Sequence, residues 1–144
     1  MSTLKVTNIR HENSGIDTLV FDNGGSNGQN GRVTTKGTIG AIHNQGTTLS
    51  GDITLDFRNG NNFSMTLTGA SELKNPTTMA AGQSGVLFIT QGVGGSHLLS
   101  YDTYWDFSDG TPPTLSTTAG AVDMVAYIVR SATKISAQFT GNFS

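Results

Sequence analysis

Residues 82–107 read GQSGVLFITQGVGGSHLLSYDTYWDF and form the densest apolar and aromatic part of the chain. A short apolar run at 86–89 is followed by a glycine cluster at 92–95 and by a second apolar segment at 98–107. Two apolar segments of strand length, separated by glycines, are typical of a β-hairpin whose loop is longer than two residues. The sequence therefore predicts a hairpin here, and we expect it to anchor a β-core.

The region before this stretch alternates apolar and polar residues. Such alternation with a period of two indicates strands that bury one face. The apolar positions are Ile53, Leu55 and Phe57, and then Phe63, Met65 and Leu67. An Asn/Gly-rich segment at 58–62 separates the two runs. The pattern predicts a second hairpin over residues 53–67.

The region after it contains the longest apolar run of the chain, residues 122–129. Its β-branched residues and the lack of a helix cap favour a central strand. A final alternating run has Ile135, Ala137 and Phe139 on one face, and residues 130–134 connect the two runs. We therefore predict a central strand followed by a last strand.

The N-terminal region has a different character. Residues 1–22 contain two short extended segments, and residues 22–31 read DNGGSNGQNG. Asn-Gly and Gly-Gly steps supply the positive φ angles that loops need. We therefore predict an N-terminal docking arm and glycine loop at 1–31 and a body at 32–144.

No apolar stripe with helical spacing persists over a helix length in this sequence. Many short strands separated by turns are typical of antiparallel sandwiches and jelly-roll-like barrels. The expected fold is all-β: an antiparallel β-sandwich or jelly-roll-like body with an extended N-terminal arm. The pattern does not distinguish a sandwich from a barrel.

The composition excludes several functional classes. Charged residues make up 12% of the 144-residue chain, about half the usual share of ~25%. The net charge is −2 and no Lys/Arg run occurs, so nothing indicates binding to nucleic acid or a membrane. Cysteine is absent, which excludes disulfides and thiolate chemistry. No signal-peptide or membrane-spanning pattern is visible, so we expect synthesis in a cytoplasm.

No catalytic, metal-binding or cofactor-binding motif emerges, and we predict that the protein is not an enzyme. His11, His43 and His97 have no partner ligands at metal-site spacing. A local acidic group consists of Asp102, Asp106 and Asp109. It could bind calcium or act in glycoside hydrolysis only together with further carboxylates at suitable spacing. Roles in turns and at strand edges are therefore the favoured interpretation. The glycine clusters lack the G-K-[ST] continuation of a phosphate loop.

Three aromatic residues stand close together at the end of the opening stretch: Tyr101, Tyr104 and Trp105. Aromatic faces beside Asp and Asn side chains suit a carbohydrate, so these residues are candidate ligand contacts. The alternative is a packed corner or a subunit interface, because tryptophan buries a large apolar area and this is the only one. Packing is the favoured interpretation.

Few lysines or prolines protect the predicted strand edges, which favours coverage by neighbouring subunits.

Two regions also resemble virion structural proteins of tailed bacteriophages, especially those of marine cyanobacteria. The first is LKVTNIRH at 4–11, followed by DTLVF at 17–21. The second runs from GQSG at 82–85 through ITQ, LSY, WDF and GTPP to AVD at 121–123.

This resemblance implies a structural virion component without catalytic residues or cofactors. The segment between the two regions is too short for the shaft of a long fibre, so a capsid decoration (cement) protein or a small tail fibre fits better. Such proteins are commonly trimers, and the expected partners are other copies of the chain and a major capsid protein or a tail protein. A receptor- or glycan-binding module is the alternative. The docking arm would use Leu4, Val6, Ile9, Leu19 and Phe21.

Overall fold

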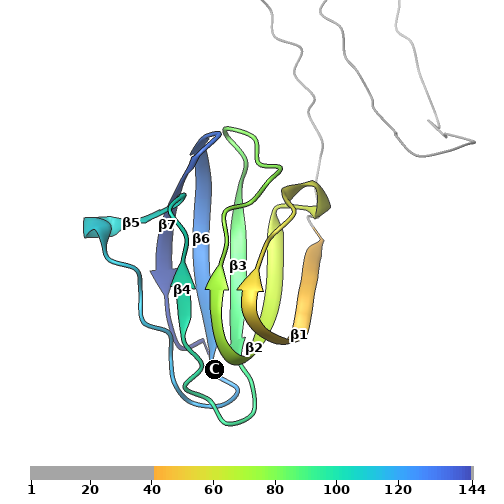
Figure 1. Cartoon of the computed structure of the whole chain (residues 1–144), viewed down its shortest axis with the longest axis vertical. Helices are drawn as coiled ribbons and strands as arrows, with labels where there is room; N and C mark the ends of the chain where they lie inside the picture. Colours follow the sequence, from red (N-terminus) through yellow and green to blue (C-terminus); the bar gives the residue numbers. More distant parts are fainter. Residues whose placement is uncertain (1–40, 144) are drawn as a thin grey trace, which may run out of the picture. The chain divides into compact units, whose positions relative to one another are not determined.

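The computed structural model describes residues 41–143, and Figure 1 shows them as a single β-rich body. The described residues form seven strands and two short 3-10 turns. The strands are β1 (Ile42–Ile53), β2 (Asn62–Leu73), β3 (Ser84–Gln91), β4 (Leu99–Tyr101), β5 (Trp105–Phe107), β6 (Val122–Ser131) and β7 (Lys134–Thr140). The turns are η1 (Phe57–Asn59) and η2 (Ser108–Gly110). The prediction of an all-β fold is confirmed for this part of the chain.

The strands form one mixed sheet in the order β1-β2-β3-β6-β7-β5, and β4 pairs separately with β2. The neighbours of β6, which are β3 and β7, run antiparallel to it. The other pairs, β1–β2, β2–β3, β2–β4 and β5–β7, are parallel. The sheet is therefore mixed. The turn-rich sequence predicts a purely antiparallel sheet, and that part of the prediction is wrong. Composition and alternation report which face of a strand is buried, and they do not report strand direction.

The predicted hairpin over residues 53–67 is wrong. β1 and β2 are parallel neighbours, with Ile53 opposite Leu73. Ile53, Leu55 and Phe57 are all buried, so their alternation correctly marks burial. The strand nevertheless ends at Ile53, and the Asp56 side chain accepts a hydrogen bond from the Arg58 backbone N–H to start η1. The chain then crosses back and begins β2 at the same end as β1.

The predicted hairpin over residues 82–107 is also wrong. Both edges of β3 are occupied, one by β2 and the other by β6, so no edge is free for the following strand. The segment after the glycine loop becomes β4 and pairs with the last residues of β2, Ser71 to Leu73. The opening stretch therefore supplies strands to two different parts of the sheet.

The predictions for the C-terminal part are confirmed. β6 lies between β3 and β7 in the sheet, so it is a central strand. β6 and β7 form an antiparallel pair joined by a tight turn between Ser131 and Lys134. Ile135 and Ala137 are buried and Phe139 packs against the core, as the alternation indicated.

β1 was not predicted over most of its length. Its sequence, IHNQGTTLSGDI, is largely polar, and most of its residues are exposed or half-buried. Its pairing with β2 is interrupted by register shifts around Gly46 and Leu49. An edge strand that packs against little has no apolar periodicity to reveal it.

A row of aromatic rings links the elements inside the body. The Phe57 ring lies 5.6 Å from that of Phe63 and 5.2 Å from that of Tyr127, and both pairs are stacked. Trp105 meets Tyr127 edge-on at 6.1 Å. These contacts connect η1, β2, β6 and β5, so the core joins residues far apart in the sequence.

Candidate functional site

Trp105 belongs to the core. Its side chain is only 5% exposed, and its indole nitrogen points to the Lys74 carbonyl oxygen at 3.4 Å. β5 fixes its position, because Trp105 pairs with Ile135 of β7. A ring buried on both sides presents no free face for a sugar to stack on.

Tyr101 is partly buried beside Phe107, with ring centroids 4.6 Å apart. Its hydroxyl is buried and makes no hydrogen bond within residues 41–143. Burial raises the pKa of this phenol, and the negative charge of Asp123 adds to the effect. Tyr101 is therefore neutral across the physiological pH range and acts as a packing residue at the end of β4.

Tyr104, like Tyr101, is half-buried and packs against the edge of the buried core. Its backbone is fixed on both sides. Its N–H donates to Asn75 Oδ1 at 2.9 Å, and its carbonyl oxygen accepts from the Ile135 N–H at 2.8 Å. The backbone at Tyr104 is thus held by hydrogen bonds to two different segments.

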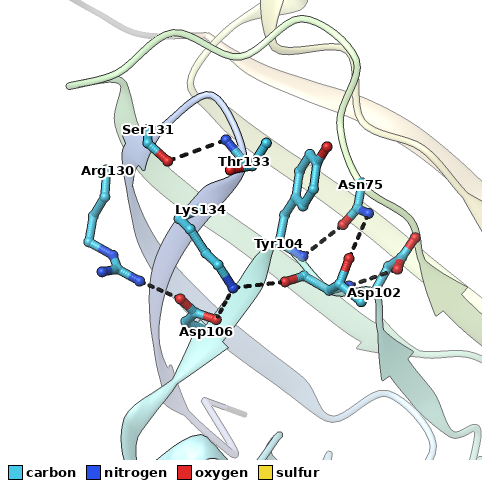
Figure 2. Close-up of polar contacts among 9 residues, drawn as sticks. Asn75, Asp102, Tyr104, Asp106, Arg130, Ser131, Thr133 and Lys134 are labelled. Carbon is cyan, nitrogen blue, oxygen red and sulfur yellow. Dashed lines mark hydrogen bonds and ion pairs between the residues drawn. The ribbon is translucent and has the colours of Figure 1, made fainter.

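A polar cluster surrounds Tyr104 and joins four segments of the chain (Figure 2). Asn75 Nδ2 donates to Thr103 Oγ1 at 3.2 Å, and Lys134 Nζ donates to the Thr103 carbonyl oxygen at 3.3 Å. Lys134 also contacts Asp106 at 3.1 Å, and Arg130 forms a second ion pair with the same carboxylate. These contacts lie at the surface and fasten the Tyr101–Phe107 segment to β7.

The acidic group predicted at residues 102–109 does not converge. Asp106 is paired with Arg130 and Lys134, whereas Asp102 lies 3.6 Å from Lys74. The Thr103 N–H, the nearby lysine and other hydrogen bonds lower the pKa of Asp102. A general acid in glycoside hydrolysis needs the opposite shift. Within residues 41–143, no three His, Asp or Glu side chains lie close enough to hold a metal ion.

The two described histidines lie in separate places. His43 packs edge-on against Phe63 at 5.9 Å. The His97 ring lies 3.2 Å from the Val93 carbonyl oxygen, inside the loop between β3 and β4. His11 lies outside the described residues. Each described histidine therefore has a local structural contact.

Two buried polar residues were missed by the sequence analysis. Asp123 is fully buried on β6, where its carboxylate accepts hydrogen bonds from Ser116 N, Ser116 Oγ and Asn142 N at 2.7–2.9 Å. Gln91 is 2% exposed, and its side chain binds the N–H and the carbonyl oxygen of His97. One sequence feature could have indicated the buried role of Asp123: it is the single carboxylate inside the longest apolar run.

A shallow, open depression of about 600 Å³ lies over β5, β6 and β7. Phe107, Tyr127 and Ala137 contribute its apolar part, and Asp106 and Arg130 stand at its polar side. Because those two charges already pair with each other, the depression offers no free charge to a ligand.

The proposed docking-arm residues Leu4, Val6, Ile9, Leu19 and Phe21 lie outside the described residues, so the structure does not test them. The chain matches no protein-family model, no curated protein and no solved structure. In the described part of the chain, no helix is long and apolar enough to cross a membrane.

Proposed function

We propose that this protein is a non-enzymatic structural component of a tailed-phage virion. It acts as a capsid decoration (cement) protein that docks on the particle surface as a homo-oligomer, with a trimer expected from the resemblance. Its partners are other copies of itself and a major capsid protein or a tail protein. It is made in the host cytoplasm and ends in the virion.

One observation carries this proposal beyond the sequence resemblance. The polar side chains best suited to chemistry in residues 82–123 are used in contacts that hold the body together. Asp106 joins β5 to β6 and β7, Gln91 fixes the β3–β4 loop, and Asp123 fixes two segments against β6. This use of polar groups suits a building block.

The proposed body is a β-sandwich. β2 pairs with β3 over Asn62–Leu67 and with β4 over Ser71–Leu73, so its two parts have different neighbours. Figure 1 shows β1 and β2 curving at their middle. A sheet that folds over in this way can enclose a core between two layers. Leu67 and Leu73, on either side of the curve, belong to the same buried cluster.

The position on the particle is the first test. Mass spectrometry of isolated heads and isolated tails should find the protein with the heads. Its presence in tails alone supports the small tail-fibre alternative, and its absence from both overturns the virion proposal.

The docking arm has a separate test. Deletion of residues 1–22 should abolish binding to particles, while near-UV circular dichroism of the body, which reports on Trp105, stays unchanged. Because residues 1–31 are the proposed arm, a shortened protein that still binds particles overturns the docking role.

A receptor- or glycan-binding module is the second candidate, favoured by the half-buried Tyr104 beside Asn75 and Thr103. A glycan array should then give a hit that Tyr104→Ala removes and Tyr104→Phe retains, because only the first change removes the stacking ring. An array without a hit, or equal binding by both variants, removes this candidate.

A further inference from the structure

Five segments of the chain gather at one end of the body, which lies at the bottom of Figure 1. We call this the neutral end and define it as residues 46–51, 68–70, 92–98, 116–121 and 141–143. Hydrogen bonds hold several of these segments to their neighbours. Thr68 Oγ1 binds the Leu49 carbonyl oxygen at 3.4 Å, and the Ser96 N–H binds that of Thr117 at 2.8 Å. The Phe143 N–H binds the Val122 carbonyl oxygen at 2.8 Å, which holds the C-terminal segment there.

The neutral end contains no aspartate, glutamate, lysine or arginine in any of its five segments. It does carry apolar side chains. Val93 is 95% exposed, Leu98 is 67% exposed and Phe143 is 55% exposed. Only two other large apolar side chains are strongly exposed among residues 41–143, Ile42 and Ile128. Depletion of charge together with exposed apolar side chains is typical of the centre of a protein–protein interface.

The loop that carries Val93 and Leu98 is held in place. Its anchors are the buried Gln91 side chain, the Ser96–Thr117 hydrogen bond and the contact of the His97 ring with the Val93 carbonyl oxygen. An added Cβ on Gly95 would lie 2.3 Å from the Thr117 carbonyl oxygen, so the two loops are in close contact. Binding through a fixed loop loses little conformational entropy.

The charges lie elsewhere on the body. Every lysine and arginine among residues 41–143 pairs with a carboxylate of the same chain. The pairs are Arg58 with Asp56, Lys74 with Glu72 and Asp102, and Arg130 and Lys134 with Asp106. The Ser131–Lys134 turn and η1 both lie toward the end opposite the neutral end in Figure 1. The ion pairs of Asp56 and Asp106 thus lie away from the neutral end, whereas Asp52 and Glu72 follow two of its segments closely in β1 and β2.

We propose that the neutral end is the subunit contact, where it meets the same surface of a second copy of this chain around a symmetry axis. This inference rests on the homo-oligomer named in the proposed function and assigns its interface. Burying an unpaired charge is costly, so a surface without charges excludes partners that would place charged side chains against it. A second copy of the chain offers such a surface, because its own neutral end carries exposed apolar side chains and contains no charged residue. Residues that lie beside the symmetry axis of a closed oligomer meet the same residues of the neighbouring copies.

The first test measures the molar mass of the full-length protein by sedimentation velocity. The wild type should be an oligomer. Val93→Lys and Leu98→Lys should each weaken association by about tenfold or more, because each loses a buried apolar side chain and introduces a charge. Ile128→Lys is the matched control, since its side chain is exposed outside the neutral end, and it should leave the mass unchanged. Val93→Ser repeats the test with a milder change.

The second test uses the absence of cysteine from the chain. Val93→Cys or Leu98→Cys should give a covalent dimer after mild oxidation or treatment with a short bis-maleimide, whereas Ile128→Cys should stay monomeric. A monomeric wild type, or an oligomer unaffected by both lysine variants, overturns the interface. These results are obtained on purified protein, so they are separate from the presence of the protein in heads or tails.

Discussion

Single residues set the spacing between segments of this body, and Gly85 is the clearest case. An added Cβ on Gly85 of β3 would lie 1.7 Å from the backbone carbonyl oxygen of Asn61. Backbone atoms cannot move aside as a flexible side chain can. The carbonyl oxygen of Asn61 also accepts the Tyr127 hydroxyl at 2.6 Å, so displacing it disturbs the core.

Gly85→Ala should therefore lower the free energy of unfolding by about 3 kcal/mol, the upper part of the range for overpacking a tightly packed site. Urea denaturation measures this change. Ser84→Ala, at the neighbouring exposed position, is the control and should have little effect. A Gly85→Ala protein as stable as the wild type contradicts the close approach.

Asp123 is the second residue whose loss should be severe. Its buried carboxylate satisfies two backbone N–H groups, those of Ser116 and Asn142, and one hydroxyl. Asp123→Ala leaves these groups unpaired and should cost about 3 kcal/mol. Hydrogen exchange should also become faster at the Ser116 and Asn142 amides. Unchanged exchange at both amides would show that the carboxylate does not hold these segments.

At the scale of elements, Asp56 determines where β1 gives way to η1. Its carboxylate binds the Arg58 guanidinium, the Arg58 N–H and the Thr78 hydroxyl. The pKa of Asp56 lies well below its ordinary value of 3.8. The hydrogen bond with the Arg58 side chain lowers it most, followed by that with the Thr78 hydroxyl. A carboxylate whose pKa is lower in the folded state stabilises the protein above its unfolded pKa, and this stability is lost as the pH falls further.

Asp56→Asn should therefore flatten the loss of stability below about pH 4, because the group that takes up a proton on unfolding is gone. Thermal unfolding of both proteins between pH 6 and pH 2 measures this. Asp109→Asn is a useful control, since Asp109 is exposed and has no ion pair among the described residues. Parallel pH profiles for the wild type and Asp56→Asn would contradict the assignment.

The same elements show which features of the fold the sequence can predict. Alternation correctly identified buried positions such as Leu55, Phe63 and Ile135, because burial of one strand face follows directly from the pattern. It could not identify partners, since the pairing of β4 with β2 depends on which sheet edges are free after β3 is enclosed. The hydrogen-bond partners of the buried Asp123 were not predictable, because the three groups that bind its carboxylate come from segments seven and nineteen residues away.

The candidate site was predictable to a similar extent. The packing interpretation of Trp105 agrees with its position in the core, and the single tryptophan was a usable signal. The separation of Asp102 from Asp106 was not predictable, because it depends on Lys74 and Lys134, which come from distant parts of the chain. Charge pairing of this kind appears only when the strands are assembled.

At the scale of the whole molecule, the distribution of charge predicts how assembly responds to salt. The lysines and arginines of residues 41–143 already have partners, and the neutral end contains no charges. Salt screens attraction between charges but does not weaken apolar contacts. The mass of the proposed oligomer, measured by light scattering, should therefore be the same in about 0.1 M and about 1 M NaCl. Dissociation at the higher concentration would indicate an interface held by charges.

The turn between β6 and β7 has a practical consequence. Residues 131–134 are all exposed, and the turn lies at the end of the body opposite the proposed contact. Exposed turns of this kind tolerate inserted sequence. A foreign epitope placed between Ala132 and Thr133 would project from every subunit of the proposed oligomer. The chain would then serve as a scaffold for multivalent antigen display.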